Sequence, residues 1–308
     1  MGDNNIMVSI CCIAYNHASY IRECLESFVT QKCDFVFEVL VHDDASTDDT
    51  QAIIKEYEAK YPHIIKAICQ TENQYSKIGS VSDINYERAR GKYVAICEGD
   101  DYWCDVNKLQ KQVDFLESHP DVGLCYAKAK CYNESAKYFD GSIGYALKGY
   151  EQLLRNNRIP TNTVCLRNEL LQIYLKELLP AVKAKKWRMG DFPLWLYFAS
   201  RLKLYFMDEY LGVYRVLPES ASHSSNAKKR YLFEKDVRDI KLFFYEYGKL
   251  NNKRLKDYFH KKFIRKAFDL YKRSGDKSFI SEILSSVKAL SCPRLRSVYV
   301  RLYFKFLG

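Results

Sequence analysis

Cysteine pairs at metal-binding spacing are missing from this 308-residue chain. Its eleven cysteines are an odd number, and no two of them form a CxxC pair, which excludes the spacing typical of zinc sites. A chain of this length also buries enough apolar surface to fold without disulfides. We therefore expect reduced thiols in a cytosolic setting. Cys11, Cys12 and Cys97 lie in or at the end of apolar runs and are expected to be unreactive core residues.

Long apolar segments are missing as well. Residues 1–5 carry no positive charge, and the apolar stretch 6–14 is too short for the core of an export signal. No segment reaches the roughly 18 consecutive apolar residues that a membrane-spanning helix needs. The expected location is therefore the cytoplasm, with peripheral attachment to the inner face of the membrane as an option.

Glycine-rich phosphate-binding loops are the third absence. Neither GxxxxGK[ST] nor GxGxxG occurs in the sequence, so the phosphates of a nucleotide would have to be held in another way. What the chain does contain is 47% hydrophobic and 15% aromatic residues. That composition excludes a disordered chain.

The net charge of +10 is unevenly placed. Residues 228–308 hold 22 basic and 8 acidic residues, a net +14, whereas residues 1–227 hold 26 basic and 30 acidic residues, a net −4. A uniformly basic nucleic-acid-binding protein is therefore a poor description. An acidic or neutral body followed by a basic appendage is a good one.

Apolar runs alternate with helical spacing over the first 125 residues. Strands are predicted at residues 7–14, 35–41, 64–69 and 93–97, with helical patterns between them. Continuous apolar strands alternating with helices predict an α/β fold, in which a mostly parallel sheet is flanked by helices. Beyond Pro120 the alternation weakens: strands are predicted at 122–126 and 203–207, and helices at 150–155 and 168–179. From residue 228 onward the pattern is wholly helical.

Acidic pairs follow two of the predicted strands. Because ligands bind at the carboxyl ends of parallel strands, Asp43 with Asp44 and Asp100 with Asp101 are candidate site residues. Adjacent carboxylates repel unless a cation lies near them, so Asp100 and Asp101 predict a divalent metal bridging to phosphate, or alternatively the cap of a helix starting near Asp105. The earlier pair is either a turn and cap or an acceptor for a base or ribose.

Three ordered motifs together carry a family resemblance. They are Val8–Asn16 (VSICCIAYN), Val41–Thr50 (VHDDASTDDT) and Gly91–Asp101 (GKYVAICEGDD). Their order and spacing resemble the opening of family 2 glycosyltransferases of the GT-A fold, of the bacterial surface-polysaccharide type. The resemblance covers about residues 6–125 and extends more weakly to about 215.

The resemblance implies roles for residues that would bind the donor. Ile13, Ala14 and Tyr15 would line the nucleotide pocket, and Asp44 would lie at the uracil ring. Asn85 resembles a polar residue of the family that faces the donor.

The same resemblance implies a metal-binding element. Asp101 would be the direct ligand of Mn²⁺ or Mg²⁺, and Asp100 would lie nearer the sugar or ribose. Arg215, in the segment YRVLPES, is a candidate to pair with a phosphate or an active-site carboxylate. Leu217 stands where a histidine that completes the metal shell is often found. His223 could replace that histidine, or it could be a plain surface residue.

A general base is expected later in the chain. Residues 187–195 (WRMGDFPLW) resemble the family motif in which an acidic residue precedes an apolar helix, and Asp191 is that residue. An inverting transfer needs a base to take the acceptor's hydroxyl proton, and apolar neighbours would raise the pKa of Asp191 toward a useful range. Alternatively, Asp191 caps a helix beginning at Pro193, and both roles can hold together.

The basic region 228–308 carries amphipathic helices with Lys- and Arg-rich polar faces. That composition favours contact with an anionic membrane surface. The alternative is a helical bundle packed on the catalytic domain with a solvated basic face. Nucleic acid is not an expected partner, because no recognised binding module accompanies the charge.

The sequence thus predicts an inverting, metal-dependent glycosyltransferase that uses a UDP-sugar donor and a growing, lipid-linked glycan acceptor in surface polysaccharide synthesis. Residues 1–227 would form the catalytic domain, with a nucleotide-binding half at about 1–125 and an acceptor-side half at about 126–227. Two rivals remain at this point. One is another metal-nucleotide enzyme, such as a nucleotidyltransferase, and the other is a catalytically inactive, membrane-associated binding protein.

Overall fold

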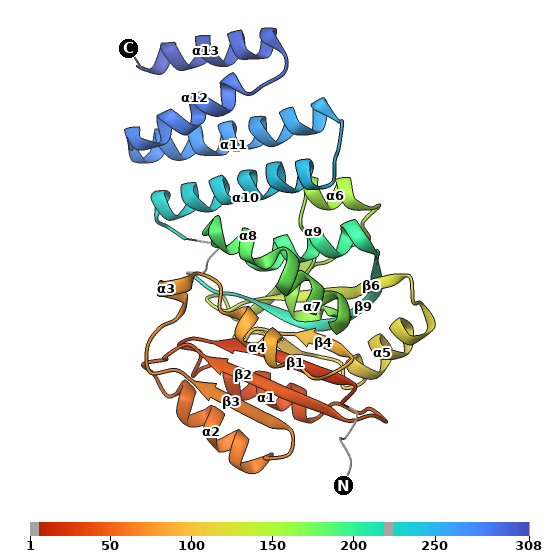
Figure 1. Ribbon diagram of the computed structural model, residues 1–308. Helices are drawn as coiled ribbons and strands as arrows, with labels where there is room; N and C mark the ends of the chain where they lie inside the picture. Colours follow the sequence, from red (N-terminus) through yellow and green to blue (C-terminus); the bar gives the residue numbers. More distant parts are fainter. Residues whose placement is uncertain (1–5, 219–223, 308) are drawn as a thin grey trace. The chain divides into compact units, whose positions relative to one another are not determined.

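The computed structural model describes residues 6–218 and 224–307 (Figure 1). The chain divides into two compact units, residues 1–216 and 217–308. The strands, all in the first unit, are β1 (Val8–Ala14), β2 (Phe37–Asp43), β3 (Ile65–Cys69), β4 (Tyr93–Ile96), β5 (Tyr102–Trp103), β6 (Val122–Asn133), β7 (Tyr138–Ile143), β8 (Cys165–Arg167) and β9 (Lys203–Val216).

Helices accompany the strands throughout the first unit. They are α1 (Ile21–Val29), α2 (Thr50–Lys60), α3 (Tyr75–Ile78), α4 (Ser82–Arg88), α5 (Lys108–Ser118), α6 (Tyr150–Arg155), the 3₁₀ turn η1 (Thr161–Thr163), α7 (Asn168–Glu177), α8 (Leu179–Ala184) and α9 (Asp191–Arg201). The second unit contains α10 (Ala227–Tyr247), α11 (Lys253–Ser274), the 3₁₀ turn η2 (Lys277–Phe279), α12 (Ile280–Lys288) and α13 (Pro293–Leu307).

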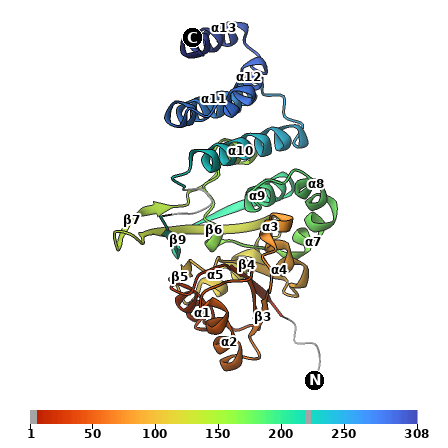
Figure 2. The same ribbon diagram turned by 90° about the vertical axis from the view of Figure 1, so that its left-hand side faces the viewer.

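One mixed sheet organises the first unit (Figure 2). The strand order is β3-β2-β1-β4-β8-β6-β9-β5, and β7 pairs with β6. Strands β1 to β4 run parallel, as do β6 and β9, whereas β8, β5 and β7 pair antiparallel with their neighbours. The predicted α/β class is confirmed. The antiparallel strands escaped prediction because β5 and β8 are only 2 and 3 residues long and β7 is exposed along nearly all its length.

Burial on both faces explains why β1 reads as a continuous apolar run. On one face its side chains join a core to which α1, α2 and α5 contribute Phe28, Ile54 and Leu109 among others. Helix α4 packs against β1 and β2, α7 packs against α4 and β8, and α9 packs against α7, β6 and β9. A strand covered on both faces has no polar side to display. The core includes Cys12 and Cys97, which are fully buried as expected.

The start of β4 lies very close to β1. The backbone N–H of Gly91 donates to Ser9 Oγ at 2.8 Å, and Ser9 Oγ donates to the buried carboxylate of Glu38 at 2.7 Å. A side chain at position 91 would have its Cβ 2.5 Å from the backbone nitrogen of Ser9. Only glycine leaves room for this approach, so it holds the first residues of β4 in register with β1.

The regular structure described in the second unit is helical, as the periodicity predicts. Asn226 caps α10 by accepting from the N–H of Lys229, and Asn252 caps α11 in the same way. The core centres on Tyr231, whose ring stacks on Phe279 with centroids 3.9 Å apart, together with buried apolar residues of α11 and α12. Among the described residues, no helix has the length and apolar character needed to cross a bilayer.

Candidate functional site

The carboxyl ends of β1, β2 and β4 meet at one edge of the sheet. The N–H of Asp44 donates to the carbonyl of Ala14 at 2.9 Å, and the N–H of Gly99 donates to the carbonyl of Ile13 at 2.9 Å. Residues 98–101, which we call the acidic loop, follow β4. A Cβ at position 99 would lie 3.1 Å from the Cβ of Ala14, so glycine lets the acidic loop pack directly on the end of β1. The structure thus brings together the three motifs that the sequence singles out.

Asp101 is the most deeply buried acid of that loop, at 3% exposure. Its Oδ1 accepts the backbone N–H of Arg215 at 2.8 Å. Burial raises the pKa of Asp101 well above its ordinary value, and the charges of Asp100 and Glu98 raise it further. Neither aspartate caps the following helix, because α5 begins only at Lys108. The site therefore confines negative charge that a nearby cation would relieve.

Arg215 reaches this loop from β9 and is 6% exposed. Its Nη1 donates to the backbone carbonyl of Asp100 at 2.6 Å, and its Nη2 forms an ion pair with Glu23. Its Nε lies 3.6 Å from a carboxylate oxygen of Glu134. The guanidinium also lies over the ring of Tyr102, 4.7 Å from the centroid. The structure therefore pairs Arg215 with carboxylates and fixes it beside Asp101.

A small cavity of about 30 Å³ lies beside the acidic loop. Ile13, Glu98 and Asp191 line it together, so residues from β1, the acidic loop and α9 share one space. The remaining lining residues are Cys11, Ser82, Tyr86, Ile96, Cys97 and Thr161. The predicted nucleotide-binding and base residues are thus neighbours in the fold.

Asp191 is the first residue of α9, two residues before the predicted helix start at Pro193. Its Oδ1 accepts the backbone N–H of Phe192 at 2.7 Å, and its Oδ2 accepts the hydroxyl of Thr161 at 3.1 Å. Burial raises the pKa of Asp191, while these two hydrogen bonds favour the ionised form. The direction agrees with the effect expected from its apolar neighbours.

Glu98 is a site residue that the sequence reasoning missed. Burial raises its pKa to about 8, and the charges of Asp100 and Asp191 act in the same direction. The signal available in the sequence was its position, three residues before Asp101 and directly after the apolar run of β4. Its side chain faces the same cavity as Asp191.

The acidic pair after β2 has roles within its own loops. Asp43 accepts the N–H of Ser46 at 2.9 Å, as in a turn. The two carboxylate oxygens of Asp44 accept the backbone N–H groups of Gln74 at 2.7 Å and Tyr75 at 2.9 Å, at the start of α3. Asp44 thus ties the loop after β3 to the end of β2, and its contact with a base stays a prediction.

Asn85 has a structural role within the protein, and its contact with the donor stays a prediction. Its Nδ2 donates to the backbone carbonyls of Cys12 at 2.8 Å and Leu40 at 3.0 Å. Its Oδ1 accepts from the guanidinium of Arg88. The residue is fully buried, and its amide is satisfied by the protein, so it fastens α4 to the sheet. The sequence alone could not separate these roles, because both require a polar residue on α4.

Tyr15 and Ala14, at the end of β1, differ in exposure. Tyr15 is 46% exposed directly after β1, whereas Ala14 is buried at the strand's end. His223 lies outside the described residues.

The described residues provide some of the oxygen ligands that a divalent metal needs, but not a full set. Within 6–218 and 224–307, no cluster of three or more His, Cys, Asp or Glu side chains is arranged to hold an ion. Mg²⁺ is commonly bound by one or two carboxylates and completed by water and substrate phosphates, and Mn²⁺ likewise favours oxygen ligands. The buried carboxylate of Asp101 beside Asp100 fits that kind of incomplete site.

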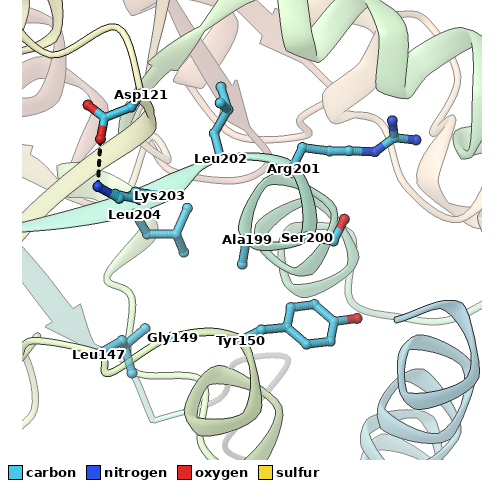
Figure 3. Close-up of a pocket in the computed structure, with 10 residues that line it drawn as sticks. All are labelled: Asp121, Leu147, Gly149, Tyr150, Ala199, Ser200, Arg201, Leu202, Lys203 and Leu204. Carbon is cyan, nitrogen blue, oxygen red and sulfur yellow. Dashed lines mark ion pairs between the residues drawn. The ribbon is translucent and has the colours of Figure 1, made fainter. Parts of the chain in front are cut away.

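A larger cavity of about 650 Å³ lies elsewhere in the first unit (Figure 3). It is lined by residues around the end of α9 and the start of β9, including Tyr150, Leu202 and the ion pair of Lys203 with Asp121. None of the predicted site residues lines it. Its size therefore does not make it the catalytic centre.

Comparison with known proteins places these features in context. The model of a family described as Glycosyl transferase family 2 matches residues 9–172. An uncharacterized protein of Mycobacterium tuberculosis is 40% identical over 165 residues, which cover 53% of this chain and 47% of the relative. The chain thus spans about half the length of that relative. The Bacillus subtilis protein named "Putative teichuronic acid biosynthesis glycosyltransferase TuaG" is 27% identical over 240 residues, covering 76% of this chain and 89% of the relative.

Solved structures extend the likeness to nearly the whole chain. The crystal structure of Staphylococcus aureus TarS 1–349 in complex with UDP has a TM-score of 0.60, with 19% identity, and covers 92% of this chain and 79% of that chain. At that identity the likeness concerns the fold, and it confirms the predicted GT-A architecture. The family match ends at residue 172 and does not include Asp191 or Arg215.

Proposed function

Because the chain belongs to glycosyl transferase family 2, we propose that it transfers a sugar from a UDP-sugar to a glycan acceptor by an inverting, metal-dependent reaction in surface polysaccharide synthesis. We assign the reaction to residues 1–227. The name of the relative TuaG supports the surface polysaccharide setting, and the complex of TarS with UDP supports the choice of nucleotide.

One observation carries the proposal: the acidic loop and helix α9 each contribute one acid, in different surroundings, to the lining of one cavity. The acidic loop bears Glu98, Asp100 and Asp101, and its charges repel one another. Asp191, which lines the cavity together with Glu98, is held instead by hydrogen bonds from Thr161 and Phe192. Such a division suits a reaction in which one group of acids holds the donor and another acid handles the acceptor's proton.

Asp101, with Asp100 beside it, would hold Mn²⁺ or Mg²⁺. Bound there, the ion would supply positive charge to the leaving diphosphate. The chain has no glycine-rich phosphate loop, and the one arginine fixed at the loop, Arg215, is already paired with Glu23. Carboxylates therefore have to bind the diphosphate through a cation.

Asp191 would act as the base that takes the proton from the acceptor's attacking hydroxyl. Its raised pKa makes it a stronger base than an exposed aspartate, because burial disfavours the ionised form. The hydrogen bond from Thr161 fixes the orientation of the carboxylate at the first turn of α9. An acid held on the acceptor side, opposite the leaving group, is what a single displacement with inversion requires.

Ile13, Ala14, Tyr15 and Asp44 would form the nucleotide side of the pocket. The end of β1 and the start of the loop after β2 are joined by the hydrogen bond from Asp44 to Ala14. Ligands of open α/β sheets bind at such strand ends. The exposed ring of Tyr15 is free to stack on a base.

A lipid-linked acceptor on an anionic membrane is the last part of the proposal. Among the described charged residues of the second unit that are exposed, fourteen are basic and only Glu246 and Asp269 are acidic. Such a surface favours anionic lipid headgroups. The enzyme would thus work at the inner face of the membrane, where a lipid-linked glycan is presented.

UDP binding measured with and without Mn²⁺ tests this function. We expect Mn²⁺ to tighten UDP binding at least about tenfold by calorimetry, because the acidic loop repels a diphosphate without a cation. Asp101→Asn should abolish this gain. The amide keeps an oxygen for the N–H of Arg215, so the variant should remain folded.

Asp114→Asn is the matched control, because Asp114 is an exposed acid on α5 away from the loop. It should bind UDP and Mn²⁺ as the unmodified chain does. The proposal is wrong if Mn²⁺ has no effect on UDP binding, or if the folded Asp101→Asn variant retains the full effect. Release of pyrophosphate from UTP, without transfer from any UDP-sugar, would favour a nucleotidyltransferase.

A further inference from the structure

A strip of aromatic and cationic side chains lies on one face of β6, β7 and β9. It comprises Lys128, Lys130, Tyr132, Phe139 and Tyr210, which we call the aromatic strip. Alternate residues of a strand share a face, so the three members on β6 point the same way. The register places Tyr210 opposite Lys128 and Phe139 opposite Tyr132. Three strands therefore contribute to one continuous surface.

The side chains of the aromatic strip contact one another. The Nζ of Lys130 lies 5.9 Å from the ring centroid of Phe139 and 5.6 Å from that of Tyr210. The rings of Tyr132 and Phe139 meet edge to face, with centroids 5.1 Å apart. Phe139 is 53% exposed and Tyr210 is 44% exposed. Large aromatic faces are thus held open to solvent around an ammonium group.

Charge on this surface is unbalanced at Lys130. Lys128 forms an ion pair with Asp208, but no carboxylate pairs with Lys130 among the residues that the structure describes. The exposed ammonium has only the two ring faces as neighbours within cation–π distance. It is therefore available to an anionic group from outside the chain.

The aromatic strip is continuous with the acidic loop. Tyr132 pairs in register with Arg215 on β9, and the backbone N–H of Arg215 donates to Asp101. From that point the paired strands β6 and β9 run back from Tyr132 and Arg215 to Lys130 and Lys128. A chain that begins at the acidic loop would pass along this face.

We propose that the aromatic strip binds an anionic glycan, with Lys130 pairing with its carboxylate or phosphate groups. This inference rests on the proposed function and specifies the acceptor's chemistry. The C–H faces of sugar rings pack on aromatic rings, and the ammonium supplies a charge-assisted hydrogen bond.

Oligosaccharide binding to the full chain tests the assignment. The probes are pentagalacturonate, mannopentaose phosphate and neutral mannopentaose, measured by calorimetry at low salt. We expect at least one anionic probe to bind about tenfold more tightly than the neutral one, and Lys130→Glu to remove that preference. The tighter of the two anionic probes identifies carboxylate or phosphate as the recognised group.

Lys55→Glu provides the matched control, since Lys55 is an exposed lysine of α2 outside the aromatic strip. It makes the same charge change and should keep the preference. Equal binding of all three probes, or an unchanged preference in Lys130→Glu, would overturn the inference. Failure of the proposed function appears separately, as a lack of Mn²⁺-enhanced UDP binding in the unmodified chain.

Cys104 gives a second readout at the same surface. It is exposed, and its thiol lies 3.3 Å from the backbone oxygen of Tyr210. Desolvation raises the pKa of the Cys104 thiol, and the charge of Lys130 opposes that rise. Bound anionic glycan should slow its alkylation by iodoacetamide several-fold, followed by peptide mass spectrometry. An unchanged alkylation rate at saturating glycan would place the binding elsewhere and contradict the inference.

Discussion

Asp191 stands under two opposed influences. Burial disfavours its charge, whereas the N–H of Phe192 and the hydroxyl of Thr161 favour it. The outcome is a carboxyl group whose pKa is raised but whose ionised form has prepared hydrogen-bond partners. A base of this kind combines greater proton affinity with a fixed direction.

Replacing Asp191 with asparagine should separate transfer from donor binding. We expect the transfer rate of Asp191→Asn to fall about 10²- to 10⁴-fold, the usual range for a lost general base. The affinity for UDP with Mn²⁺ should change little, because the role proposed for Asp191 is to take the acceptor's proton and not to hold the diphosphate. Sugar transfer and UDP calorimetry measure the two effects, and Glu169→Gln, an exposed acid of α7, is the control. Retained transfer would place the base elsewhere.

The same experiment has a pH dependence with a definite sign. A base is active when deprotonated, and the raised pKa of Asp191 delays deprotonation to higher pH. Transfer by the unmodified chain should therefore rise as pH increases through that raised pKa. The residual activity of Asp191→Asn should lack this rise.

At the residue scale, the sequence identified candidate acidic residues more readily than it predicted the burial and hydrogen-bond partners of each side chain. Asp101 was recognisable because two acids follow a buried strand, and it does lie buried beside the end of β1. The structural role of Asn85 was not visible in the sequence, because its hydrogen-bond partners Cys12 and Leu40 lie 73 and 45 residues away. Glu98 was missed because burial, which raises its pKa, depends on the fold around it.

At the scale of the elements, the close packing of β1 against the start of β4 depends on one residue. Gly91 permits this approach, because an added Cβ would meet backbone atoms of residues 8, 9 and 93 at 2.5 to 2.8 Å. Backbone atoms of a central strand cannot shift as a flexible side chain can. The position is therefore sensitive to a single methyl group.

Gly91→Ala should lower the free energy of unfolding by about 2 to 4 kcal/mol, the range for severe overpacking. Urea denaturation followed by circular dichroism measures the change. Lys92→Ala is a suitable neighbour for comparison, because it removes an exposed ion pair with Glu117 and a cation–π contact with Tyr93, each worth at most about 1 kcal/mol. Equal urea midpoints for the two variants would contradict this prediction, because they would show that β1 and β4 can move apart with little loss of stability.

The apolar pattern predicted the length of a strand correctly only where both faces of the strand are buried. The prediction for β6 stopped at Tyr126, whereas the strand continues to Asn133. The added residues include the exposed Lys130, so the apolar run ends before the hydrogen-bonded ladder does. The predicted strand 203–207 likewise extends to Val216, through the polar residues that follow Met207.

At the scale of the whole molecule, charge is divided unevenly between the two units. The first unit concentrates acids where a diphosphate would bind, and the second exposes an excess of basic side chains. Helix α13 shows this well, because Arg294, Val298 and Arg301 share one face and are all exposed.

The full chain should sediment with vesicles containing phosphatidylglycerol and remain in solution with pure phosphatidylcholine vesicles. Binding should weaken severalfold at about 0.5 M salt, because screening shortens the reach of surface charges. Combining Arg294→Gln with Arg301→Gln should reduce the bound fraction. The pair Lys32→Gln and Lys55→Gln, in the first unit, should not. Equal sedimentation with both lipids would refute a role for the basic surface.

The crowding of carboxylates in the loop from Glu98 to Asp101 has an evolutionary consequence. Raised pKa values mean that the fold tolerates these charges rather than being stabilised by them. Selection for a more stable fold would replace these acids with amides or apolar residues, and selection for the proposed donor binding would oppose that replacement. Under the proposed function, the loop is a position where the fold is less stable than the sequence could make it.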